Sequence, residues 1–242
     1  MSGQESISAE RGAAPSQMAL DLGLPPPPLP APARETPRET PRETPRAAAR
    51  RFNLSHALRD VCAHLVKEVP ELRYVAIEQV AVSFTRARRR GRVGQHARCV
   101  ATRFPGGGRE GDIDGRPHRA DIVRIDEWEP LYILYFVLPR FWEEPFHEKI
   151  ATLIHELYHI SPECDGALRR FPGARHSHGG TREEYHQRMR ALAQRYLTRH
   201  ERHPPLEVLR HSLETLERRH GELRYLRITQ PRFRPIPPPR RR

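Results

Sequence analysis

The chain has 242 residues, of which 37% are hydrophobic, with 25 prolines and a formal net charge of +12. The prolines gather between Pro15 and Pro45 and between Pro231 and Pro239, which leaves roughly 180 residues, enough for a hydrophobic core. No stretch approaches the ~18 consecutive apolar residues of a membrane span, so we expect no membrane association. We also expect no secretory signal, because no basic start is followed by an apolar run.

The positive charge is unevenly distributed along the chain. Residues 1–50 carry equal numbers of arginines and acidic residues, whereas residues 231–242 carry five arginines and no acidic residue. Two dense groups, Arg86–Arg92 and Arg240–Arg242, could contact the phosphates of a nucleic acid or could simply be a solvated turn and tail. Nucleic acid is therefore one candidate partner.

The cysteines indicate a reducing compartment. Cys62, Cys99 and Cys164 form no C-x-x-C pair, and their odd number does not suit a disulfide framework. We therefore expect a cytoplasmic protein.

The first residues are predicted to form a disordered arm. Residues 1–50 contain the run Pro25–Pro28 and tandem R-E-T-P repeats, without any apolar period. A folded domain is expected over residues 51–230, beginning with a helix from Asn53 that Pro70 ends.

The next segments predict a sheet. Valine and isoleucine enrich Arg73–Phe84, which predicts one or two strands, and His96–Phe104 predicts another. Residues 109–128 are polar and are expected to be irregular. The strongly apolar run Leu131–Leu138 predicts a strand at the centre of the sheet.

Helices are expected to dominate the remainder of the domain. Pro145 can start a helix that Ser161-Pro162 ends, and Thr181 with Glu184 forms a capping box that predicts a second. A last helix is expected over Leu206–His220, and residues 231–242 are predicted to be a disordered basic Pro/Arg tail. This order predicts an α+β fold with a small antiparallel or mixed sheet.

The most informative motif is H-E-L-Y-H at residues 155–159. Residues four apart project from one helix face, so His155 and His159 can reach the same metal ion. Zinc held by neutral imidazoles activates water for attack on a carbonyl, and Glu156 lies close enough to act as the general base. The sequence therefore predicts a zinc site, Zn²⁺ being the expected cofactor.

A catalytic zinc usually takes three protein ligands, and the third is open on sequence alone. His178 is favoured because Gly179-Gly180 lets the backbone turn tightly beside it. The other candidates are His176, Glu183, Glu184 and, more weakly, Asp165. No residue is assigned to stabilise the oxyanion, for which Tyr158, Tyr185, His176 and Arg175 are all candidates.

The motifs carry a family resemblance. The runs L-I-H-E-L-Y-H-I, D-G-A-L-R-R and H-S-H-G-G-T-R-E-E-Y resemble the phage-type metallopeptidases and, more distantly, the SprT-like zinc proteases. The resemblance covers roughly residues 53–200 and implies a zincin-like domain with a sheet of three or four strands packed on the H-E-x-x-H helix. It also strengthens His178 as third ligand, because His178-Gly179 and Tyr185 match the SprT-like pattern. The loop from His159 to His178 and the absence of a four-cysteine ribbon depart from that pattern.

The leading expectation is a zinc metallopeptidase that hydrolyses peptide bonds in a protein or peptide substrate. The alternative is a basic, DNA-associated binding protein whose zinc is structural and has a fourth protein ligand from His176, Asp165 or Cys164. A weaker third possibility is a toxin or effector whose R-E-T-P arm docks on a partner.

Overall fold

The fold is described from a computed structural model, which describes residues 51–87, 94–170 and 182–237. The helices are α1 (Leu54–Glu68), α2 (Phe146–Tyr158), α3 (Arg182–His200) and α4 (Leu213–His220), with 3₁₀ turns at Pro70–Leu72, Ile77–Gln79, Pro105–Gly107 and Pro204–Arg210. The strands are β1 (Phe52–Asn53), β2 (Val80–Arg86), β3 (Ala97–Ala101), β4 (Glu110–Ile113), β5 (Arg116–Ala120), β6 (Tyr132–Leu138), β7 (Leu223–Arg224) and β8 (Phe233–Pro235). This composition confirms an α+β fold.

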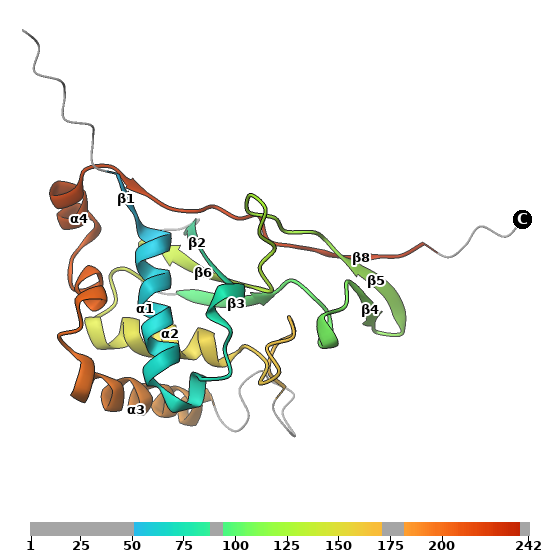
Figure 1. Cartoon of the computed structure of the whole chain (residues 1–242), viewed down its shortest axis with the longest axis horizontal. Coiled ribbons are helices and arrows are strands. Elements are labelled where there is room, and N and C mark those ends of the chain that lie inside the picture. The colour runs from blue at the N-terminus through green and yellow to red at the C-terminus, as the bar shows by residue number, and fades with distance from the viewer. Residues whose placement is uncertain (1–50, 88–93, 171–181, 238–242) are drawn as a thin grey trace, which may run out of the picture. The chain divides into compact units, whose positions relative to one another are not determined.

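A three-stranded mixed sheet in the order β2-β6-β3 lies at the centre of the domain. β6 pairs in parallel with β2 and antiparallel with β3, which confirms that Leu131–Leu138 holds the central strand. Figure 1 shows α1 and α2 beside this sheet, with α3 next to α2. β3 is an edge strand of this sheet.

The main core forms where the apolar faces of the helices pack on the central sheet. The stripe of α1 from Leu54 to Val66 and the α2 residues Ile150 and Leu153 pack with one face of the sheet. The other sheet face carries a smaller cluster around Ile133 and Tyr135. Cys62 is fully buried in the main core, and burial raises the pKa of its thiol to about 12.

Several predicted boundaries are wrong for identifiable reasons. The stretch from Arg73 to Gln79 contains a 3₁₀ turn rather than a strand, and the strand begins only at Val80. The predicted helix over Leu206–His220 is interrupted at His211 and Ser212, where Ser212 caps the shorter α4 by accepting a hydrogen bond from the amide of Thr215. α2 ends at Tyr158, before Ser161-Pro162.

Two segments that were expected to lack structure form a second sheet. β4 and β5 form a hairpin within residues 109–128, and β8 of the predicted disordered tail pairs with β5. Pairing with a remote segment supplies the backbone hydrogen bonds that the polar local sequence does not suggest. The predicted arm 1–50, most of Arg86–Arg92 and Arg240–Arg242 lie outside the described residues. Among the helices of the described ranges, none is long and apolar enough to cross a membrane.

Candidate metal and catalytic site

The two histidines of the motif face each other at the end of α2. His155 lies in its last turn, and His159 follows directly in helical backbone conformation, so their side chains project from one face. Their Nε2 atoms are 2.9 Å apart, and their ring planes are inclined by 65°. The predicted convergence of this pair is therefore present in the fold.

This geometry fits a shared metal ion. Two imidazole nitrogens bound tetrahedrally to zinc at 2.0–2.1 Å lie about 3.3 Å apart, a few tenths of an ångström more than observed here. The same separation also suits a direct hydrogen bond, in which one ring donates and the other accepts.

An aromatic wall fixes the orientation of the imidazoles. The ring of Tyr185, which is 4% exposed, packs edge-on against His155 at 4.9 Å and lies nearly parallel to His159 at 6.0 Å between centroids. Tyr185 comes from the first turns of α3, whose apolar stripe with Met189 packs against α2. The packing of α3 therefore limits how the two histidines can turn.

Glu156 lies between α2 and the edge strand β3. Its carboxylate accepts a hydrogen bond from the backbone amide of Cys99. Burial raises the pKa of Glu156 to about 8; the Cys99 amide opposes this shift, and the nearby Glu144 carboxylate adds to it. The side chain is thus held in one position beside the two histidines, in a weakly hydrated environment.

A cleft of about 740 Å³ runs along this arrangement. Its walls come from β3, α2 and α3, and they include Ala97, Cys99, Ala151, Thr152, His186 and Met189. Ala151 lies one turn before His155, and its small side chain leaves the cleft open there. The motif therefore borders a space large enough for an extended peptide segment.

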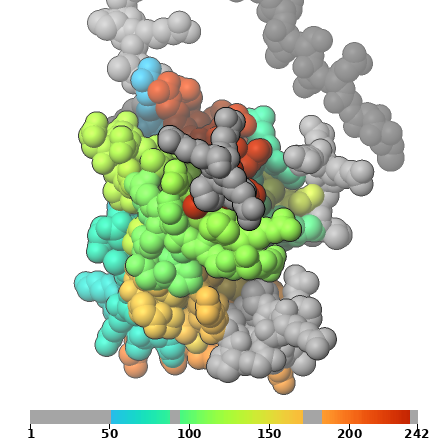
Figure 2. All heavy atoms as spheres, turned by 90° about the vertical axis from the view of Figure 1, so that its right-hand side faces the viewer, coloured from blue at the N-terminus to red at the C-terminus, as the bar shows by residue number. Residues whose placement is uncertain are grey.

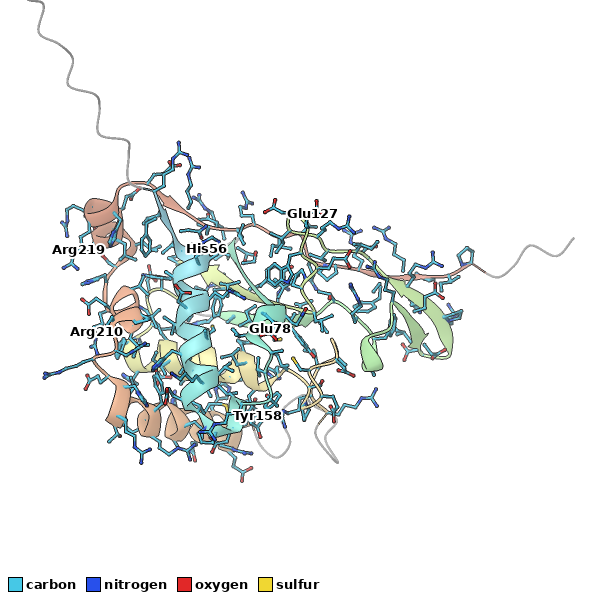
Figure 3. All side chains as sticks on the ribbon, in the orientation of Figure 1. His56, Glu78, Glu127, Tyr158, Arg210 and Arg219 are labelled. Carbon is cyan, nitrogen blue, oxygen red and sulfur yellow. The ribbon has the colours of Figure 1, made fainter. Side chains whose placement is uncertain are left out.

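Arg169 anchors the C-terminal end of α2, which carries the histidine motif. Its backbone amide donates to the carbonyl of His159 at 2.7 Å, and its Nε donates to the carbonyl of Tyr158 at 2.8 Å. The guanidinium lies over the Tyr158 ring at 4.1 Å, and Arg188 of α3 approaches the same ring at 5.1 Å. Figure 3 labels Tyr158 at this end of the helix. These contacts satisfy the last carbonyls of the helix and hold the motif in place.

The other predicted ligands divide into two groups. His176 and His178, with Arg175, lie in the segment 171–181, outside the described residues. Glu183 and Glu184 are exposed on the first turn of α3 and do not line the cleft. Within the described ranges, no group of three or more His, Cys, Asp or Glu side chains is arranged to hold a metal ion.

Asp165, the weaker candidate ligand, belongs to a local hydrogen-bond network and does not line the cleft. Its carboxylate accepts hydrogen bonds from Ser161 Oγ at 2.6 Å and from the amides of Gly106 and Ala167 at 2.5 and 3.1 Å. The loop after α2 is thereby joined to the 105–107 turn, and Figure 2 shows this loop (gold) against the green residues above it. Cys164 is also engaged away from the histidines, because its sulfur accepts a hydrogen bond from the amide of Ala76.

His186 is the cleft residue that the sequence interpretation missed. It lies on α3 with its ring 5.3 Å from that of His155, and it lines the cleft together with Met189 and Arg190. The available signal was its helical spacing from Met189 and Arg190, which places all three on one face.

Comparison of the chain with family models, with curated proteins and with solved structures found no match. The chemistry of the site therefore rests on its own residues.

Proposed function

We propose that this protein is a zinc-dependent peptidase of zincin-like fold, with His155 and His159 as two metal ligands and Glu156 as the general base. The observation that carries the proposal is the pair of Nε2 atoms 2.9 Å apart, beside a buried carboxylate in an open cleft. The third ligand would come from the segment 171–181, where His178 remains the preferred residue.

The edge strand supports a peptide as the substrate. The amide of Val137 donates to the carbonyl of His96, and the amide of Thr102 donates to the carbonyl of Leu131. Residues that hydrogen-bond to the partner strand alternate along an antiparallel strand, so Arg98 and Val100 also direct their backbone groups toward β6. The alternating residues Ala97, Cys99 and Ala101 therefore direct theirs outward, along the cleft. An extended peptide can add to such an edge as a further strand, which places its backbone alongside Glu156 and the histidines.

Each side chain then has a distinct task in hydrolysis. A bound zinc ion supplies a Lewis acid that polarises a carbonyl and lowers the pKa of water. Glu156 accepts the proton of the attacking water and passes it to the leaving amine. The Cys99 amide orients the Glu156 carboxylate, and Tyr185 restrains the histidine rings.

The decisive experiment measures zinc content and hydrolysis of unfolded casein by the full chain. We expect about one zinc per wild-type chain, less in His155→Ala, and an unchanged content in His118→Ala, whose histidine lies on β5 away from the cleft. Glu156→Gln should retain zinc but lose hydrolysis by at least ~10²-fold. A wild-type protein that takes up no zinc when it is offered, or a Glu156→Gln variant with wild-type turnover, would contradict the proposal.

A further inference from the structure

A pocket lined by arginines adjoins the cleft at the start of β3. It has a volume of about 540 Å³ and is lined by Arg86, Arg98 and Arg140 together with apolar and neutral polar residues. Among its described lining residues there is no carboxylate. Gln95 and Arg98 line both this pocket and the cleft, so the two spaces meet at the edge strand.

Arg98 is positioned for a ligand on the face of the sheet opposite α2. Side chains alternate along a strand, and Ala97 and Cys99 point to the α2 side. The guanidinium of Arg98 accordingly lies over the ring of Tyr135, 5.0 Å from its centroid. No ion pair joins Arg98 to a carboxylate within the described ranges, which leaves its charge available to a ligand.

The neighbouring arginines reinforce this positive charge. Arg140 packs closely over Gly94, where an added Cβ would lie 2.5 Å from its Nη1 atom. The backbone of Gly94 has a φ of +128°, a conformation that favours glycine, so both the space and the turn depend on this residue. Arg86 is exposed at the end of β2 and completes the pocket.

We propose that this pocket is a specificity subsite that selects an aspartate or glutamate side chain in the peptide substrate. The inference rests on the proposed function. In a peptide paired with the outer edge of β3, successive side chains alternate between the α2 face and the opposite face. The residue opposite Arg98 therefore projects on the same sheet face as the Arg98 guanidinium, beside the arginine-lined pocket and next to the residue that faces Glu156. Opposite charges on directly facing strand residues attract, and a guanidinium binds a carboxylate through paired hydrogen bonds.

The geometry favours a substrate side chain over a nucleic acid. The three arginines line one concavity that continues the peptide cleft, and Arg98 is the immediate neighbour of Cys99, which contacts Glu156. A nucleic acid backbone would instead be matched by cations spread along a surface at the intervals of its phosphates.

The test is to map cleavage sites in a library of denatured proteome peptides, using the zinc-loaded full chain. The wild type should prefer aspartate or glutamate at one fixed position from the cleaved bond, over asparagine or glutamine at that position. Arg98→Gln should lower this preference by up to ~5-fold while cleavage continues. Arg227→Gln is the matched control, because Arg227 is exposed and lines neither space; its preference should equal that of the wild type.

The possible results separate the subsite from the peptidase activity. Cleavage by the wild type without an acidic preference overturns the subsite and leaves the proposed function intact, whereas absence of any cleavage overturns both. Arg86→Gln provides a second variant at an exposed position, and it should also reduce the preference if Arg98→Gln folds poorly. If Arg98→Gln instead bound a fluorescent single-stranded oligonucleotide more weakly and kept the acidic preference, the subsite would be overturned and Arg98 would be assigned to nucleic acid binding.

Discussion

Replacing Asp165 by alanine should destabilise the protein without removing a metal ligand. The substitution deletes three hydrogen bonds, from Ser161 Oγ at 2.6 Å and from the amides of Gly106 and Ala167 at 2.5 and 3.1 Å. Hydrogen bonds to charged groups contribute about 1.5–3 kcal/mol each when buried. Asp165 is only half-buried, so water can replace part of the network, and we expect a loss of about 2–4 kcal/mol in the free energy of unfolding.

The assay is urea denaturation of the full chain at neutral pH, combined with zinc content. Asp112→Ala is the matched control, because its carboxylate accepts one hydrogen bond, from Gly115 N at 2.7 Å in the exposed hairpin turn. It should cost only about 0.5–1 kcal/mol, and neither variant should change the zinc content of folded protein. Equal losses of stability in the two variants would refute the claim that the hydrogen bonds of Asp165 stabilise the fold. Loss of zinc by a stable Asp165→Ala protein would show that Asp165 is a ligand after all.

The same network predicts a pH dependence. Burial alone would raise the pKa of Asp165, but hydrogen bonds from Ser161, Gly106 and Ala167 outweigh it, and the pKa is lowered. The contribution of Asp165 is therefore fully present above its ordinary value of about 3.9 and is lost as the pH falls through the lower, folded-state pKa. The difference in stability between wild type and Asp165→Ala should shrink over that acidic range, and a constant difference would contradict this explanation.

The elements that the sequence predicted correctly are those with strong local patterns. The stripe of α1 begins at Leu54, where Asn53 caps the helix by accepting from the amides of Ser55 and His56. β6 is an uninterrupted apolar run, which is typical of a strand covered on both faces. Such signals need no knowledge of distant contacts.

The missed elements depend on distant contacts. Residues 110–120 are polar, and β5 is stabilised by β8, whose residue Arg234 pairs with Arg119 more than a hundred positions earlier in the chain. An Asp114-Gly115 turn signal was present between β4 and β5, but the flanking residues lack an apolar alternation that would have identified strands.

For the site, helical spacing was sufficient to bring His155 and His159 together, because the distance between them is set within one helix turn. Asp165 was only a weaker candidate ligand, and the sequence could not show that its carboxylate accepts hydrogen bonds from the nearby amides of Gly106 and Ala167. His186 was missed because its role depends on how α3 packs against α2. The position of His178 depends on the segment 171–181 and stays a prediction.

Two further predictions test a tightly packed glycine after α2 and the histidines at the C-terminal end of α3. Gly166 and Gly115 both have positive φ, so replacement of either by alanine should lower the free energy of unfolding by about 1–2 kcal/mol. Gly166→Ala should lower it by a further ~1–3 kcal/mol, because the added Cβ would lie 2.6 Å from a neighbouring side chain. Equal losses for the two variants in urea denaturation would refute that clash. Burial and then the adjacent His203 and His200 lower the pKa of His64, whose ring stacks on that of His203 at 3.5 Å. Its contribution to stability is therefore complete above about pH 6.5 and is lost as the pH falls through the lowered pKa. His64→Gln should accordingly lose less stability than the wild type between pH 7 and pH 5, and parallel losses in both proteins would show that the stacked histidines do not control this pH dependence.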